Sequence, residues 1–300
     1  MGSIIDRLMS RQLITPPSFL KNNIQYEVIM GSVAYGVSSD TSDMDIYGFF
    51  VPPKYMVFPH LDGEIVGFGK HKKRINSWEK HHVKDKDARI EYDLTMYSII
   101  RYFQLCMDNN PNMIDSLFVP RRCILHSTQI GEHIRERRKD FLHKGSWYRF
   151  KGYAYSQVHK MNTKEPDETS TRFEMIQKYG FDVKFAYHVV RLLNEIEQIL
   201  IEKDLDLQRN REQLKSIRCG EWTKDQIVKY FEDKEKSLEE LYLKSDLPYA
   251  PDEEKIKTIL LECLEMHYGS LEDAIKTNIS IDQILDEMSD YIQNIRMMNK

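Results

Sequence analysis

A glycine-serine turn followed by two alternating aspartates constrains this chain more than any other feature. The apolar run 28–30 leads into Gly31 and Ser32, and Asp43 and Asp45 begin a segment of alternating acidic and apolar residues. Alternate side chains of an extended strand share one face, so both aspartates point the same way. The order predicts a buried strand, a tight turn and a second strand that carries paired carboxylates.

Paired carboxylates next to such a turn indicate phosphate chemistry. Close carboxylates repel each other unless cations neutralise them, and their hard oxygen atoms suit Mg²⁺. A third carboxylate on a neighbouring strand would complete two metal sites for in-line displacement at phosphorus. Gly31 lets the backbone approach a phosphate, and Ser32 adds a hydroxyl and an N–H donor. The alternative is a surface loop with solvated acids after a buried strand.

Several blocks of the sequence together resemble a known family. They are Gly31-Ser32-x-Ala34-Tyr35-Gly36, Ser42-Asp43-x-Asp45, the run 93–98, the run 109–118, Gly152-Tyr153-Ala154, the run 180–192 and the run 217–221. The pattern is similar to the nucleotidyltransferase superfamily that includes DNA polymerase beta and the CCA-adding enzymes. Within it, the chain resembles the RNA-repair-pathway, or RNA-ligase-associated, polymerase-beta-like family of bacteria and phages, over about residues 25–270.

The resemblance assigns roles to individual residues. It implies that Asp43, Asp45 and Asp93 are the catalytic, metal-binding carboxylates, and that Gly31, Ser32 and Tyr35 bind the nucleotide. Two Mg²⁺ ions are the implied cofactors, and Mn²⁺ is expected to substitute for them. The third carboxylate is the least certain position, because Glu91 and Asp87 have the same strand parity as Asp93.

A cationic stripe on a later helix is a second candidate for substrate contact. Lys184, His188, Arg191 and Glu195 are separated by four, three and four positions, which places them on one side of a helix. Facing the cleft, the three cationic residues would grip the nucleotide triphosphate or an acceptor phosphate. The alternative is a surface stripe in which Arg191 and Glu195 form an ion pair of a few tenths of a kcal/mol.

The order of predicted elements indicates an α+β fold in two domains. Strands are expected at 25–30, 43–51 and 88–96, and residues 54–90 look like an insertion with hairpin character. After about residue 125 only helical periodicity remains, as far as a last helix at 281–298. We therefore expect a catalytic domain at 1–125, with a small mixed sheet and helices, followed by an all-helical substrate-binding domain at 126–300.

Charge distribution favours a nucleic-acid partner without requiring one. The net charge is only −4, but residues 121–160 hold ten Lys or Arg against three acids, with aromatic residues among them. Residues 70–89 are also basic, whereas the last fifty residues are acidic. Basic and aromatic groups together suit phosphate contact and base stacking. The alternative is a solvated helix face whose aromatic residues belong to the core.

Other composition features exclude some classes of protein. No apolar stretch approaches the roughly 20 residues of a membrane helix, and the N-terminus lacks the layout of a secretion signal. The four scattered cysteines offer neither a zinc site nor a disulfide framework, so a cytoplasmic location is expected. Adjacent histidines in a strand face opposite sides, so His81 and His82 are not expected to share one metal.

Together these features predict a metal-dependent nucleotidyltransferase. It would move an NMP from an NTP to an acceptor hydroxyl, with an RNA 3′ end, such as that of tRNA, as the expected acceptor, and release pyrophosphate. Nucleotide transfer to a protein hydroxyl is the alternative reaction. A catalytically idle RNA-binding module is the alternative of a different class. The sequence does not determine the preferred nucleotide or the oligomeric state.

Overall fold

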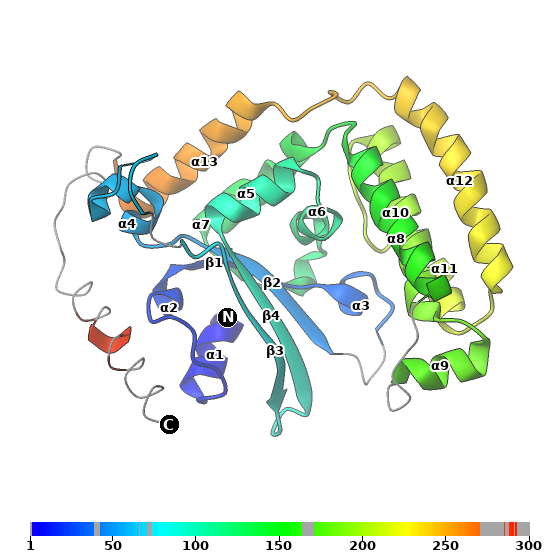
Figure 1. The fold of residues 1–300 in the computed structure, drawn as a ribbon, viewed down its shortest axis with the longest axis horizontal. Helices are drawn as coiled ribbons and strands as arrows, with labels where there is room; N and C mark the ends of the chain where they lie inside the picture. Colours follow the sequence, from blue (N-terminus) through cyan, green and yellow to red (C-terminus); the bar gives the residue numbers. More distant parts are fainter. Residues whose placement is uncertain are drawn as a thin grey trace.

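A small sheet and a group of helices beside it make up the fold, seen in a computed structural model (Figure 1). The structure describes residues 2–38, 43–65, 67–70, 74–163 and 171–270, and five single positions nearer the C-terminus. The strands are β1 (Ile24–Ile29), β2 (Met44–Phe50), β3 (Ser77–Asp85), β4 (Ile90–Ser98) and β5 (Ile124–Ser127). The helices of the sheet region are α1 (Ile4–Ser10), α2 (Leu20–Asn23), α3 (Gly31–Ala34), α4 (Lys54–Val57), η1 (Pro59–Asp62), α5 (Ile99–Met107), α6 (Pro111–Phe118) and η2 (Arg121–Cys123). The later helices are α7 (Gln129–Glu136), η3 (Arg138–Phe141), α8 (Ser146–Thr163), α9 (Thr171–Tyr179), α10 (Val183–Glu202), α11 (Arg211–Arg218), α12 (Lys224–Lys244) and α13 (Glu253–Tyr268).

The five strands form one mixed sheet in the order β3-β4-β2-β1-β5. The two central strands β2 and β4 are parallel, and each of the other three pairs is antiparallel. The predicted α+β class with a small mixed sheet is therefore confirmed.

The two faces of the central strands differ in a way that positions the site. On one face Ile46, Leu94 and Met96 are completely buried, and α1 lies on this side, where Arg7 donates to the Tyr92 hydroxyl (2.9 Å). The other face is packed only at one end, where Phe49 meets Tyr102 of α5 with ring centroids 4.8 Å apart. Towards the start of β2 this second face is half-buried, and it carries polar side chains.

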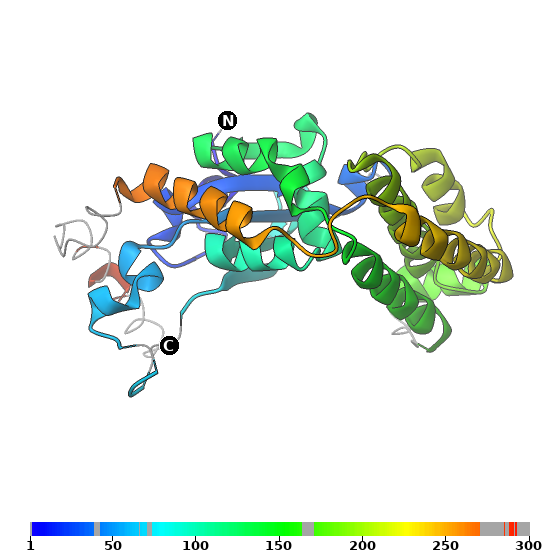
Figure 2. The same ribbon diagram turned by 90° about the horizontal axis from the view of Figure 1, so that it is seen from above.

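Helix α10 is the core of the helical region. Its N-cap is Asp182, whose carboxylate accepts from the backbone N–H groups of Lys184 (2.8 Å) and Phe185 (3.3 Å). Apolar residues at helical spacing, including Val190 and Leu193, are buried along it. Helices α8, α11 and α12 pack around it, and Figure 2 shows this group beside the sheet while α13 runs back along the sheet.

Several secondary-structure predictions need comment. Residues 77–85 form a bulged strand, paired antiparallel with β4, in the segment expected to be an insertion with hairpin character, and a further helix, α11, follows α10. Strand β5 spans the boundary predicted at residues 125 and 126, and both α7 and α13 pack on the sheet side of the molecule. The two-domain division stays a prediction. The helix expected at 281–298 lies almost wholly outside the described residues.

Candidate active site

The pairing of β2 with β4 brings two of the predicted carboxylates together. Asp45 and Asp93 are register partners on these parallel strands, and both are half-buried. Alternation places Asp45 and Asp93 on the half-buried face rather than on the face that α1 covers. Asp43 precedes the strand and is exposed. The third predicted acid thus lies where the chain enters the strand.

Gly31 packs directly against Asp45. The backbone N–H of Met30 donates to the Asp45 carbonyl (2.8 Å), which fastens the turn to β2. Gly31 has a φ of +63°, and a Cβ there would lie 2.1 Å from Asp45 Oδ2. Only glycine meets both demands, because a side chain would be strained by the backbone and would collide with the carboxylate. Ser32 follows, half-buried, at the start of the turn.

A small cavity of about 140 Å³ opens at this junction. Its walls come from the glycine turn, from β2, from α6 and from α10. The residues that line it are Met30, Gly31, Tyr35, Asp45, Tyr47, Asn112 and His188. Four of these were predicted as site residues. Met30, Tyr47 and Asn112 were not, although Tyr47 has the strand parity of Asp45 and Asn112 belongs to the matched block 109–118.

The three carboxylates share one electrostatic environment. Burial raises the pKa of Asp45, and the negative charges of Asp93 and Asp43 raise it further. The positive charges of Lys184 and His81 act in the opposite direction. Ionised acids here are therefore short of neutralising charge within the chain, which is the condition that favours a bound cation.

A bulge in β3 places two histidines beside the acids of β4. The register shifts between Lys80 and Val83, and His82 has a φ of +56°. Asp93 accepts from the His82 backbone N–H (2.8 Å) and lies 3.6 Å from the His81 ring nitrogen. The His82 ring bonds to Glu91 (2.7 Å). The expectation that the two histidines face opposite sides was wrong, because the bulge interrupts the alternation of the strand.

These contacts also separate the candidates for the third carboxylate. Glu91 has Lys84 as its register partner and bonds to His82, and this bond raises the pKa of His82. Asp87 lies beyond the strand end and pairs with Arg11. Asp93 is the acid opposite Asp45. The geometry therefore favours Asp93.

The donor set fits divalent cations although it is not a closed site. In the described part of the chain, no three His, Cys, Asp or Glu side chains converge as a ready-made metal site. The acids that are present are oxygen donors, which Mg²⁺ prefers, and Mg²⁺ commonly keeps waters and takes further ligands from a substrate phosphate. Asp45 and Asp93 on adjacent strands suit that open arrangement.

Cations on the helical side face the carboxylates across the cavity. Lys184 is exposed, and its charge acts on Asp45. His188 lines the cavity, and burial lowers its pKa well below the ordinary value, helped by Arg191, Lys184, Arg218 and Arg172. Of these cations, Arg191 is paired with Asp115 and Glu195, and Arg172 with Asp182, so Lys184 is the one placed to meet an anion beside Asp45.

Arg191 has a different place from the one predicted. Its side chain is buried, and Nη1 donates to the Tyr35 hydroxyl (2.8 Å), to Asp115 and to Glu195 (3.0 Å). Its guanidinium also lies over the Tyr35 ring, 4.3 Å from the centroid. The predicted Arg191–Glu195 pair is present but buried, and Arg191 does not line the cavity. It supports Tyr35 from behind.

Two further contacts anchor the glycine turn to the helical region. Gln208 donates to the Ala34 carbonyl (2.8 Å), and Arg218 donates to the Val37 carbonyl. Arg218 also lies over the Tyr187 ring, 5.4 Å from its centroid. The resemblance in the run 217–221 was the only signal for Arg218, and structural pairing was the expected role.

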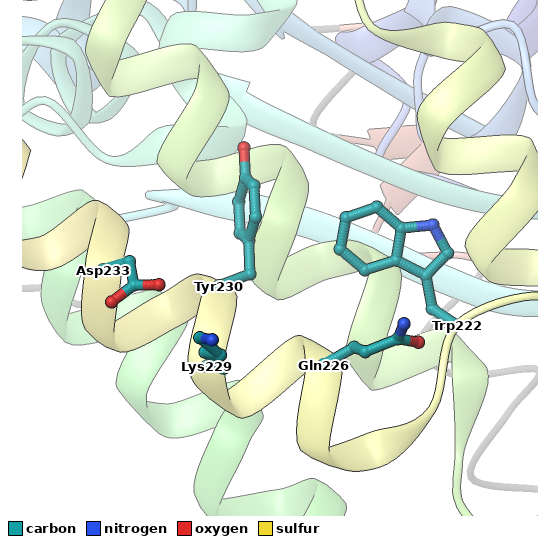
Figure 3. Close-up of a pocket in the computed structure, with 5 residues that line it drawn as sticks. All are labelled: Trp222, Gln226, Lys229, Tyr230 and Asp233. Atoms are coloured by element: carbon teal, nitrogen blue, oxygen red, sulfur yellow. The ribbon is translucent and has the colours of Figure 1, made fainter.

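Three larger hollows elsewhere in the described chain are lined by residues other than the predicted site residues. One of about 260 Å³ lies along α12 (Figure 3), lined by Trp222, Gln226, Lys229, Tyr230 and Asp233. There the Trp222 indole donates to Ser216 (3.1 Å) and the Tyr230 hydroxyl donates to Asn194 (2.7 Å). The polar tips of both aromatic residues thus have partners within the fold.

Comparison with known proteins identifies the family of this chain. The sequence profile of the RNA repair pathway DNA polymerase beta family matches residues 8–259. The chain belongs to this family. Membership makes it a nucleotidyltransferase, an enzyme that transfers a nucleoside monophosphate, and the matched residues include every carboxylate described above.

Individual relatives add little on function. The chain is 26% identical over 136 residues to an uncharacterised 38.9 kDa protein from the nrdC-mobD intergenic region of Enterobacteria phage T4. That stretch covers 45% of this chain and 37% of the phage protein. A solved nucleotidyltransferase-like protein from Exiguobacterium sibiricum 255-15 is 11% identical, with 88% of this chain and 79% of that chain covered and a TM-score of 0.28.

Within the described residues, no helix has the length and apolar character needed to cross a membrane.

Proposed function

We propose that this enzyme transfers a nucleoside monophosphate from an NTP to the 3′ hydroxyl of an RNA in a metal-dependent reaction. The observation that carries the proposal is the register pairing of Asp45 with Asp93, directly beside the Gly31 turn. Family membership supports nucleotidyl transfer. The family is assigned to an RNA repair pathway, which supports RNA as the acceptor. We place the reaction in the cytoplasm, since the exposed thiol of Cys219 is free and suits a reducing compartment.

The two sides of the cavity have complementary tasks in this reaction. Asp43, Asp45 and Asp93 would hold two Mg²⁺ ions, or Mn²⁺ in their place. The ions would lower the pKa of the acceptor hydroxyl and offset charge at the α-phosphorus. The Gly31-Ser32 turn and Lys184 would hold the triphosphate opposite the acids.

The bond changes follow from this placement. The acceptor hydroxyl oxygen forms a bond to the α-phosphorus as the bond to the bridging oxygen of the β-phosphate breaks, and pyrophosphate leaves with that electron pair. The hydroxyl proton passes to water. Tyr35 and His188 fix the shape of the cavity, and the buried contacts of Arg191 keep Tyr35 in place.

Incubation with labelled nucleotides tests the proposal directly. Purified protein is mixed with each α-labelled NTP, Mg²⁺ or Mn²⁺ and total RNA, with Asp45→Asn as the control. We expect label in RNA from wild type and a loss of at least about a hundredfold in the variant. Label in protein alone would replace RNA by a protein hydroxyl as the acceptor. An equal rate for Asp45→Asn would overturn the assigned site, and absence of label with retained RNA binding would indicate an idle binding module.

A further inference from the structure

The outer face of α8 combines aromatic rings with positive charge. The helix contains Arg149, Lys151 and Lys160 and no Asp or Glu. Its exposed large apolar side chains are all tyrosines, namely Tyr148 (61% exposed), Tyr153 (39%) and Tyr155 (65%). Exposed rings in a basic setting are typical of surfaces that bind single-stranded nucleic acid.

A hollow of about 370 Å³ lies on this face. Tyr148 and Tyr153 line it, together with Lys160 and with Arg149, which also pairs with Asp108 (3.1 Å). Gly152 lies between the two rings, and a Cβ at that position would meet nothing within 4 Å. Glycine within a helix costs about 0.5–1 kcal/mol relative to alanine. Here it leaves open space between the two tyrosines.

Two further tyrosines lie on the sheet face of the carboxylates. Tyr47 shares the face of Asp45 on β2, and Tyr97 shares the face of Asp93 on β4. Both side chains are half-buried, so this face of the sheet presents aromatic rings beside the acids.

Helix α6 links the hollow on α8 to the cavity at Asp45. The side chain of its N-cap Asn110 donates to the Tyr153 hydroxyl (2.8 Å), and Asn112 of the same helix lines the cavity at Asp45. Two residues at the start of α6 thus contact the two sites: Asn110 contacts the hollow on α8, and Asn112 contacts the cavity at Asp45. A strand of nucleic acid lying on α8 would meet the carboxylates at its end.

We propose that Tyr97, Tyr153 and Tyr148 form a track on which the bases of a single-stranded RNA acceptor stack, with its 3′ end at Asp93. The proposal rests on the proposed function for the chemistry at that end. Stacking on tyrosine needs no particular base, and the cations of α8 offset the phosphates between stacked bases. A duplex hides its base faces, so it would not use the rings.

Binding measured without chemistry tests the track. A fluorescent single-stranded oligoribonucleotide is titrated with the full chain, without NTP, and anisotropy is recorded. We expect the Tyr148→Leu/Tyr153→Leu variant to bind at least about tenfold more weakly. Tyr153→Phe keeps the ring, and Tyr155→Leu removes a ring of the same helix outside the hollow, so both should remain within about twofold of wild type. Thermal unfolding confirms that each variant is folded.

The outcomes separate the track from the proposed function. Unchanged binding by the double leucine variant overturns the track, even where labelled nucleotide enters RNA. Equal binding of a duplex of the same sequence, or an equal loss in Tyr155→Leu, also overturns it. Ring-dependent binding in a protein that transfers no nucleotide to RNA supports the track and removes the proposed reaction. In an active enzyme the double variant should raise KM for RNA more than it lowers kcat.

Discussion

Two groups of carboxylates lie close together in this protein and are treated in opposite ways. Asp115 and Glu195 are completely buried, and Arg191 neutralises them while the Tyr35 hydroxyl donates to Asp115 (2.8 Å). Asp45 and Asp93 are half-buried on neighbouring strands, and the contributions that oppose the raised pKa of Asp45 come from Lys184 and His81. Asp115 and Glu195 find their counter-charge within the chain. The acids of the proposed site leave theirs to be supplied by a ligand.

Removal of Arg191 should give the largest effect on stability. Arg191→Leu leaves two buried carboxylates without their cation and should cost about 3–5 kcal/mol of unfolding free energy. Chemical denaturation measures this. Glu195→Gln is the matched control and should cost no more than about 1 kcal/mol, because Arg191 keeps Asp115 as its charged partner and the amide oxygen can still accept from it. Equal stability of Arg191→Leu and wild type would remove the distinction between the two groups.

Gly31→Ala should be the next most damaging change. The new Cβ would overlap Asp45 Oδ2, and the backbone has a φ of +63°. We expect a loss of about 1–3 kcal/mol in stability and at least about tenfold in transfer rate. Gly180→Ala is the control, because Gly180 has a φ of +81° and open space around it. A control that loses as much activity would show that backbone strain alone explains the result.

Added Mg²⁺ should bind the acids of the proposed site and so raise the stability of the folded protein. The buried cluster of Asp115, Glu195 and Arg191 should not bind it. At ten times its dissociation constant a ligand adds about 1.4 kcal/mol to the stability of the folded state. We expect the Tm of wild type to rise with Mg²⁺ and the Tm of Asp45→Asn to stay constant. Differential scanning calorimetry of both proteins at increasing Mg²⁺ concentrations measures the two Tm values. An identical rise in the two proteins would place the ion elsewhere.

His143 offers a smaller test of the same rule in a third region. It is buried before α8, bonds to the Met107 carbonyl (2.8 Å) and accepts from the Gly145 N–H (3.1 Å). Burial lowers its pKa, so the folded protein keeps it neutral while the unfolded chain takes up a proton below about pH 6.5. Stability should therefore fall with pH below that value, by at most about 1.4 kcal/mol per pH unit. His143→Gln should flatten this slope between pH 7 and 5, and parallel curves would contradict the assignment.

The local pattern of the sequence was enough to predict the catalytic strand. Alternation placed Asp45 and Asp93 on the faces of their strands, and the Gly31-Ser32 turn followed from an apolar run that ends at glycine. The start of α6 is equally local, with Asn110 as the N-cap and Pro111 in the first turn. Each of these features depends on residues that are close together in the sequence.

The sequence did not predict the features that depend on a bulge or on burial. One residue in the left-handed region at His82 brings both histidines to the acids of β4, and no local pattern signals it. Lys184, His188 and Arg191 share a helix stripe, yet only Lys184 is exposed, and Arg191 is buried against Asp115. Spacing along a helix gives a direction, whereas burial depends on what packs against it.

The sequence by itself determined the family and the α+β class, and it proposed the carboxylates of the site, because short-range alternation and the glycine turn are local features of the chain. Only the tertiary structure decided which acids are neutralised. The partners of Arg191 come from the residue that follows α3, from α6 and from α10, and the Asn110–Tyr153 hydrogen bond joins α6 to α8. Long-range packing brings such groups together, and charge neutralisation falls off within a few ångströms, so contact rather than sequence order sets each role.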